Sequence, residues 1–205
     1  MLPDTETLVI GLAGYARSGK DTVADLLVKQ HGFVKVRFAD ALKRGLAEML
    51  GLTPAQLDGD EKETVVPWLG VTPRHLMQTL GTEWGRNLVH PDVWVLATQR
   101  HLERLVKNGI KRIVLSDVRF ENEAVMTKYL GALVRIDRPG VGAVNGHVSE
   151  EVWELTPHLD GVLVNDGTLE DLEDKVIDLV VACRLWVQGG QKRNVEVFDG
   201  KRTTA

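Results

Sequence analysis

Residues 7–22 read TLVIGLAGYARSGKDT, and this stretch decides the fold. Its first half is an apolar run rich in β-branched residues that stops at glycines, which is typical of a buried strand. Its second half, Gly14 to Thr22, fits the pattern G-x-x-x-x-G-K, and residues 20–31 carry one apolar stripe at helical spacing. A strand, a glycine loop and a helix in this order predict a phosphate-binding loop, because backbone N–H groups and the helix dipole can hold an anion there.

The phosphate-loop pattern departs from its usual form at Asp21, which stands where Ser or Thr is usual. Lys20 is expected to neutralise the β- and γ-phosphates, and Thr22 to donate to a phosphate oxygen. Asp21 is a candidate magnesium ligand, directly or through a water, because magnesium prefers carboxylate and water ligands. The alternative is an ordinary strand-to-helix turn. The candidate nucleotide-binding residues of the loop are Gly14, Ala16, Arg17, Ser18, Gly19, Lys20, Asp21 and Thr22.

Strand and helix patterns alternate along the rest of the chain. Strands are expected at 33–38, 110–117, 132–137 and 161–166, and helices at 39–50, 54–58, 73–88, 91–108, 121–130 and 168–185. This alternation predicts an α/β fold with a five-stranded parallel sheet flanked by helices, with ligands at the carboxyl ends of the strands. The expected domain covers residues 1–187, with a helical insertion over 39–109, a lid-like segment over 138–156, and a polar tail over 188–205 that frays or forms a late hairpin.

Composition bounds the class of protein. The chain has 205 residues, 43% of them hydrophobic, which suffices for one core that folds alone. A single cysteine, Cys183, excludes a disulfide framework and points to a reducing compartment. The first residues are acidic where a signal peptide needs basic ones, and no apolar run approaches the ~18 residues that span a bilayer. With a net charge of −4, we expect no membrane and no nucleic-acid polymer as partner.

Two charged residues mark the end of the strand expected at 110–117. Asp117 stands where a carboxylate would orient the water shell of a metal ion, or else it caps the next helix. Arg119 follows on the same edge and is either a ligand-binding or a surface arginine. Both residues are kept as site candidates, Asp117 together with Asp21 for the metal.

The insertion gathers polar side chains between residues 72 and 95. Gly81 and Gly85 interrupt its helix at ~1 kcal/mol each, unless something needs close approach; the alternative is a glycine-tolerant surface helix. Trp94 is a base-stacking platform or a core residue. A phosphate loop followed by such an insertion is typical of a small-molecule kinase. The candidate acceptor-binding residues are Ala39, Asp40, Lys43, Arg74, Gln78, Thr82, Glu83, Arg86, Trp94, Arg119 and, in the lid-like segment, Glu150.

Six segments together resemble the bacteriophage-type deoxynucleoside monophosphate kinases, and the resemblance runs from about residue 7 to 183. They are GYARSGKDT (14–22), FADALK (38–43), LMQTLGTEWGR (76–86), SDVRFENEA (116–124), HVSE (147–150) and NDGTLEDL (165–172). The phosphate loop is shared with many families, whereas LGTEWGR, SDVRFENEA and NDGT in this order are more specific. The resemblance implies a P-loop kinase fold and transfer of the ATP γ-phosphoryl group, with Mg²⁺, to a deoxynucleoside monophosphate.

The resemblance also implies residue roles. Arg119 is similar to the arginine that grips the acceptor phosphate. Arg86 and Lys43 would line the acceptor pocket, and Arg138 would enter from the lid. Lys20, Arg119 and Arg138 are therefore the expected catalytic residues, and no general base is expected because a monophosphate acceptor is already ionised near pH 7. The residues that would border the ATP adenine lie between the fifth strand and the last helix and include Asn165, Gly167 and Thr168.

Two alternatives to this activity remain at the level of the sequence. One is a P-loop kinase for another small acceptor, such as dephospho-coenzyme A or phosphomevalonate, and the other is a nucleotide-binding module without turnover. If the protein is a deoxynucleoside monophosphate kinase, its expected partners are ATP and the monophosphate. We expect a monomer or a homodimer. The expected localisation is the cytoplasm, of an infected host cell if the protein is viral.

Overall fold

A computed structural model describes residues 7–142, 152–189 and 196–198. The chain divides into two compact units. Unit 1 comprises residues 1–37 and 102–205, and unit 2 comprises residues 38–101. The second unit begins where the sequence predicts a helical insertion, and it ends inside helix α5 (Val93–Lys107). Within the described ranges, no helix is long and apolar enough to cross a bilayer.

Unit 1 is built on a parallel sheet with the strand order β2-β3-β1-β4-β5-β6. Its strands are β1 (Leu8–Ala13), β2 (Val34–Val36), β3 (Arg112–Leu115), β4 (Ala132–Asp137), β5 (Gly161–Val164) and β6 (Glu196–Phe198). The five predicted strands are confirmed, although β2, β3 and β5 are shorter than expected. Strands β2 and β3 lie on one side of β1, and β4, β5 and β6 lie on its other side, so the strand order reverses at β1. In such sheets ligands bind at the carboxyl end of the strand where the order reverses.

The sixth strand corrects the prediction for the tail. A late hairpin requires antiparallel pairing, but Val197 of β6 lies opposite Val162 of β5 in a parallel ladder. A parallel partner needs a crossover, and α7 (Leu169–Gly189) supplies it. The sequence did not predict this strand, because residues 188–205 are mostly polar and a three-residue edge strand needs no apolar run.

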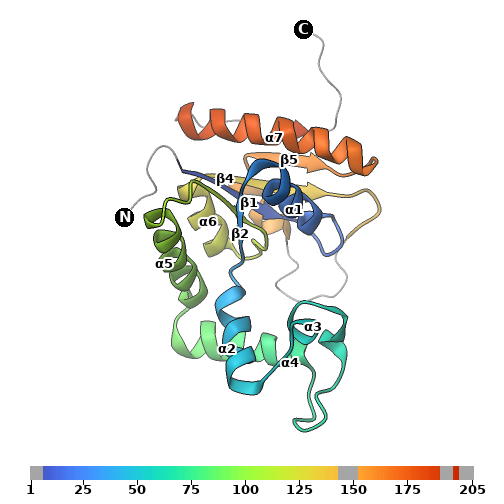
Figure 1. Ribbon diagram of the computed structural model, residues 1–205, viewed down its shortest axis with the longest axis vertical. Coiled ribbons are helices and arrows are strands. Elements are labelled where there is room, and N and C mark those ends of the chain that lie inside the picture. The colour runs from blue at the N-terminus through green and yellow to red at the C-terminus, as the bar shows by residue number, and fades with distance from the viewer. Residues whose placement is uncertain (1–6, 143–151, 190–195, 199–205) are drawn as a thin grey trace. The chain divides into compact units, whose positions relative to one another are not determined.

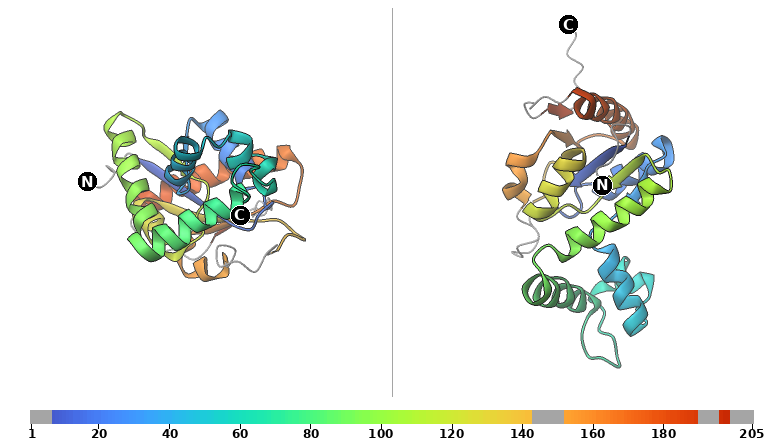
Figure 2. Two further views of the ribbon diagram at one scale, coloured as in Figure 1. Left: turned by 90° about the horizontal axis from the view of Figure 1, so that it is seen from below. Right: turned by 90° about the vertical axis from the view of Figure 1, so that its left-hand side faces the viewer.

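Helices cover both faces of the sheet, as Figures 1 and 2 show for α7 and α6 (Glu121–Leu130) on opposite sides of the strands. On one face, alternate strand residues such as Ile10 and Val134 pack with Leu27 of α1 (Lys20–His31) and Leu179 of α7. On the other face, Thr127 of α6 lies so close to Gly11 that a Cβ there would overlap it. The 3₁₀ helix η4 (Val152–His158) precedes β5.

Unit 2 is helical. Its elements are α2 (Asp40–Leu50), α3 (Pro54–Leu57), the 3₁₀ helix η1 (Asp60–Glu63), α4 (Pro73–Gln78), the π-helix η2 (Thr79–Val89) and the first part of α5. Two of its helices begin at a threonine N-cap: Thr53 accepts a hydrogen bond from the backbone N–H of Gln56, and Thr72 accepts one from that of His75. The core of the unit contains Leu42, Leu46, Leu52, Leu57 and Val66.

The helix predicted over 73–88 is not regular. It is α-helical to Gln78 and continues as a π-helix from Thr79. A Cβ on Gly85 would lie 2.7 Å from the ring of Trp94, and the indole N–H of Trp94 donates to the carbonyl oxygen of Gly81 at 2.7 Å. The two glycines therefore admit Trp94 against the helix, which is the close approach that offsets their cost.

Candidate phosphate-binding site

The loop between β1 and α1 has a backbone that requires glycine at two places. Gly14 has φ 138° and Gly19 has φ 102°, both in the region that disfavours side chains. A Cβ on Gly14 would lie 2.5 Å from the carbonyl oxygen of Ile136 in β4, and a Cβ on Gly19 would overlap the side-chain amide of Asn165. The loop is thus enclosed by the carboxyl ends of β4 and β5.

Lys20 lies over this loop. Its ammonium donates to the carbonyl oxygens of Gly14 and Tyr15, both at 2.6 Å. The hydroxyl of Ser18 is buried and has no hydrogen-bond partner in the part of the chain that is described. A cation held at the loop and an unsatisfied buried hydroxyl are the groups that phosphate oxygens can engage. The residues present fit a nucleoside triphosphate.

Arg17 is the one non-glycine residue in the described ranges with a left-handed backbone, at φ 67°. This conformation costs about 1–2 kcal/mol for a residue with a Cβ. Its side chain is exposed at the centre of the phosphate loop. Strain of this kind is characteristic of binding sites, where the surrounding structure imposes the backbone.

Asp21, predicted to hold magnesium, is paired with a lysine of β2. Lys35 donates to Asp21 at 2.9 Å and to Asp25 at 3.2 Å. Burial raises the pKa of Asp21, but the hydrogen bond and charge of Lys35, with the charges of Lys20 and Arg37, outweigh it and hold that pKa below its ordinary value. The Asp21 side chain is 81% exposed, so it stays accessible despite this pairing.

Among the described side chains, no three of His, Cys, Asp or Glu gather closely enough to hold a metal ion. Magnesium in nucleotide sites is usually held by substrate phosphates, waters and one or two carboxylates. The backbone N–H of Val118 donates to the carbonyl oxygen of Leu12 at 3.2 Å, so Asp117, the other carboxylate expected at the metal, lies beside the end of β1.

Arg119 follows Asp117 in the turn between β3 and α6, and its side chain is exposed. The backbone of this turn is held by Glu123, a residue the sequence analysis did not select. One carboxylate oxygen of Glu123 accepts from the N–H of Arg119 at 2.9 Å and from that of Phe120 at 3.2 Å. Glu123 is only 2% exposed. Its position three residues into the helix was the signal that could have found it, since acids there bond back to the preceding backbone.

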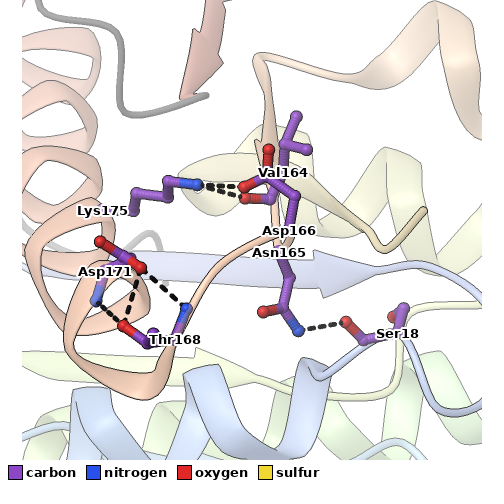
Figure 3. Close-up of polar contacts among 7 residues, drawn as sticks. All are labelled: Ser18, Val164, Asn165, Asp166, Thr168, Asp171 and Lys175. Carbon is purple, nitrogen blue, oxygen red and sulfur yellow. Dashed lines mark hydrogen bonds and ion pairs between the residues drawn. The ribbon is translucent and has the colours of Figure 1, made fainter.

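The turn between β5 and α7 lies against the phosphate loop (Figure 3). Asn165 donates from its side-chain amide to the carbonyl oxygen of Ser18 at 2.9 Å. Thr168 and Asp171 cap the start of α7, where the backbone N–H of Asp171 donates to the Thr168 hydroxyl. The hydroxyl and the backbone N–H of Thr168 both donate to the Asp171 carboxylate, which lowers the pKa of Asp171. The structure thus brings Asn165, expected to border adenine, to the phosphate loop.

The candidates in unit 2 are engaged locally. Lys43 pairs with Asp58 at 2.6 Å, and Arg74 pairs with Glu63. Arg86 donates to the carbonyl oxygen of Pro91 at 3.4 Å. Trp94 is packed within the unit. The remaining candidates are Ala39, directly before α2, Asp40 at its start, Gln78 at the end of α4, and Thr82 and Glu83 in η2.

The lid-like segment is described only at its borders. Arg138 follows β4 and is exposed. Glu150, together with His147 and Ser149, lies outside the described residues.

A parallel sheet whose first strand feeds a glycine phosphate loop, with a carboxylate and an arginine after the neighbouring strand, defines the P-loop kinase class. The fold is similar to that of dephospho-CoA kinase from Campylobacter jejuni, with a TM-score of 0.53 and 13% identity over 89% of this chain and 98% of that chain. The chain belongs to the deoxynucleotide monophosphate kinase family, and the model of that family matches residues 62–176. The family resemblance predicted from the sequence motifs is confirmed.

Relatives from a mimivirus and from phages carry that family name. A protein of Acanthamoeba polyphaga mimivirus is 35% identical over 84% of this chain and 96% of its own length. The protein of Enterobacteria phage T4 is 25% identical over 82% of this chain and 96% of its own length. The similarity therefore covers nearly the whole of both relatives.

Proposed function

We propose that this protein transfers the γ-phosphoryl group of ATP to a deoxynucleoside monophosphate, giving a deoxynucleoside diphosphate and ADP. The observation that carries the proposal is a phosphate loop, enclosed by the ends of β4 and β5, in a chain of the deoxynucleotide monophosphate kinase family. The donor triphosphate binds the loop N–H groups at the start of α1, where the helix dipole favours negative charge.

The donor site uses side chains of unit 1. Lys20 exchanges its two carbonyl contacts for phosphate oxygens, and the buried hydroxyl of Ser18 donates to the triphosphate. Magnesium bound with the nucleotide neutralises charge on the β- and γ-phosphates. Asp117 is the residue best placed to hold its water shell. Asp21, whose Oδ1 accepts from Lys35 and whose side chain is 81% exposed, can add a second carboxylate to this water shell.

The transfer requires positioning and charge neutralisation, and no base. An ionised oxygen of the acceptor monophosphate bonds to the γ-phosphorus while the bond from that phosphorus to the β–γ bridging oxygen breaks. ADP leaves with the electron pair. Arg119 holds the acceptor phosphate, and Arg138 neutralises charge on the transferring group, so each stabilises the transition state more than the ground state.

Recognition of the deoxynucleoside is assigned to unit 2. The π-helix η2 offers Thr82, Glu83 and Arg86, and Gln78 precedes them. π-Helical turns are rare and are frequent at functional sites, which supports this assignment. Trp94 acts there through packing, since its indole is committed to Gly81.

The experiment that tests the proposal measures kcat/KM for matched pairs of deoxy- and ribonucleoside monophosphates with saturating ATP and magnesium. We expect turnover of at least one deoxynucleotide, with a preference of roughly 10- to 100-fold over its ribose analogue, because a 2′-hydroxyl left unpaired in a closed site costs ~1–3 kcal/mol. The Lys20→Met variant, prepared in parallel, controls for contaminating kinases. Equal values in every pair would overturn the deoxy preference. Turnover of dephospho-coenzyme A in place of all nucleotides would overturn the proposed activity.

A further inference from the structure

A buried lysine anchors the turn between β5 and α7. Lys175 of α7 is 5% exposed, and its ammonium donates to the carbonyl oxygen of Val164 at 2.9 Å and to the carboxylate of Asp166 at 2.6 Å. Figure 3 shows these two contacts side by side at the start of the turn. A buried ammonium needs all its partners, so this lysine holds the backbone of residues 164–166 in one arrangement.

Asn165, between these two anchored residues, is directed at the phosphate loop. Its backbone N–H donates to the carbonyl oxygen of Asp137 at 2.7 Å, which ties the ends of β4 and β5 together. Its side-chain amide donates to the carbonyl oxygen of Ser18 at 2.9 Å. Figure 3 shows this amide pointing toward Ser18 and away from Lys175. The absence of a side chain on Gly19 makes room for the amide.

The bond to Ser18 has a consequence for the anion site. The carbonyl of Ser18 and the N–H of Gly19 belong to one planar trans peptide group, so they point in opposite directions. When Asn165 holds the carbonyl, it also aims the N–H of Gly19 away from itself and into the loop. An N–H group aimed in this way donates to a phosphate oxygen without reorganisation on binding.

We propose that Asn165 is a positioning residue for the donor triphosphate, with Lys175 as its anchor, and that its side chain does not read the base. The amide acts through the Ser18–Gly19 peptide, so its contribution is the same for any nucleoside triphosphate. This inference rests on the proposed function for the nature of the donor. It assigns to Asn165 a place at the phosphate end of the nucleotide instead of beside the adenine.

The test compares the binding of three magnesium-bound probes, ATP, GTP and inorganic tripolyphosphate, to the full chain by calorimetry without an acceptor. The variants are Asn165→Ala, which removes the amide, and Asn165→Asp, which places a carboxylate oxygen against the Ser18 carbonyl. We expect Asn165→Ala to weaken all three probes by the same factor, about five- to tenfold, the effect of one lost hydrogen bond. Asn165→Asp weakens them further, because it adds a negative charge beside the phosphates.

Lys175→Met provides a second route to the same result, because it keeps the buried stem and removes the ammonium. It is expected to weaken the three probes equally and by less than Asn165→Ala. The matched control is Lys128→Met, which removes another lysine that is ion-paired in unit 1, to Asp160. That control is expected to leave all three affinities unchanged.

Two results would overturn the proposal. One is a loss confined to ATP, with tripolyphosphate binding unchanged, since it would show that Asn165 contacts the base. The other is unchanged affinity for all three probes. Because no acceptor is present, failure to phosphorylate deoxynucleotides would overturn the proposed function without affecting this test. Thermal unfolding of each variant shows whether the chain is folded at the temperature of the measurement.

Discussion

The phosphate loop in unit 1 and the π-helix region in unit 2 both carry site candidates, but their polar groups are held differently. In unit 1, the side chains at the strand ends bond to backbone: Asn165 to Ser18, Glu123 to Arg119, and Lys20 to Gly14. In unit 2, Lys43 and Arg74 bond to the charged side chains of Asp58 and Glu63 near the surface, whereas Arg86 bonds to the carbonyl oxygen of Pro91.

The two units therefore differ in how their candidate site residues are held before a ligand binds. Side chains that hold backbone fix the direction of N–H groups before a ligand arrives, so their loss disturbs the loop as a whole. Ion pairs between exposed side chains contribute ~0–1 kcal/mol and exchange partners easily. Substitutions in unit 1 should therefore have the larger effects, and the following tests run from the largest expected effect to the smallest.

Lys20→Met removes the charge at the phosphate loop. We expect kcat/KM to fall on the order of 10³ or more, because a charge clamp in a closed site is lost in the transition state. The midpoint of thermal unfolding should change little, since the Lys20 ammonium bonds to the carbonyl oxygens of the loop. Steady-state kinetics and calorimetry check both parts. Equal loss of activity and of stability would assign Lys20 a structural role instead.

Arg119→Ala removes the proposed clamp on the acceptor phosphate. Turnover should fall on the order of 10² with little change in ATP affinity, because a clamp of this kind is worth ~3 kcal/mol in the transition state. Kinetics on the acceptor and calorimetry on ATP measure the two quantities separately. If ATP affinity falls as far as turnover, Arg119 belongs to the donor site.

Glu123→Ala sharpens the comparison, because this carboxylate holds the backbone of the Arg119 turn. Two partly buried N–H groups, those of Arg119 and Phe120, lose their acceptor, at about 1–3 kcal/mol of unfolding free energy. Acceptor KM should rise while ATP KM does not. Glu123→Gln retains an acceptor oxygen and should restore most of both quantities. Thr53→Ala, which removes a helix cap in unit 2, is the matched control, and an equal rise in acceptor KM there would refute a specific role for Glu123.

Lys43→Met tests the unit 2 side of the comparison. Its ion pair with Asp58 is partly exposed, so we expect at most about 1 kcal/mol of destabilisation. If Lys43 also meets the acceptor, the variant raises acceptor KM while Asp58→Asn, which frees the ammonium, does not. An equal rise in both variants would show that the pair acts only through the structure of α2 and the following loop.

Asp21→Asn is the smallest effect. The carboxylate pKa is lowered and that of Lys35 is raised, since their mutual hydrogen bond and attraction outweigh burial. The stabilisation is therefore present above the ordinary carboxyl pKa of about 3.9 and lost as the pH falls through the lowered value. At the other end it is lost as the pH rises above about 10.4 and through the raised lysine pKa. Because Asp21 is so exposed, we expect no more than about 0.5 kcal/mol at pH 7. Unfolding at pH 7 and below pH 3 checks this, and a difference that persists in acid would exclude the ion pair as its source.

The sequence predicted best the helices and strands in which the hydrophobic periodicity runs without interruption. Helix α1, helix α6 and strand β4 have the bounds expected from the sequence. The π-helix was missed because glycines interrupt the apolar stripe from which a helical period is read. Neither the bond from Asn165 to Ser18, across 147 residues, nor the burial of Glu123 is local. Both depend on which strand ends the sheet places together, which periodicity does not report.

The order of the strands in the sheet also governs how the chain can fold as it is synthesised. Strand β1 lies between β3 and β4, so both of its neighbours are made roughly a hundred residues after it. At typical ribosomal rates this leaves β1 without a partner on either side for about ten seconds. Its apolar residues are then an open template for association with other chains. The segment that forms the phosphate loop is therefore the one whose folding waits longest, and high contact order should make refolding slow and sensitive to concentration.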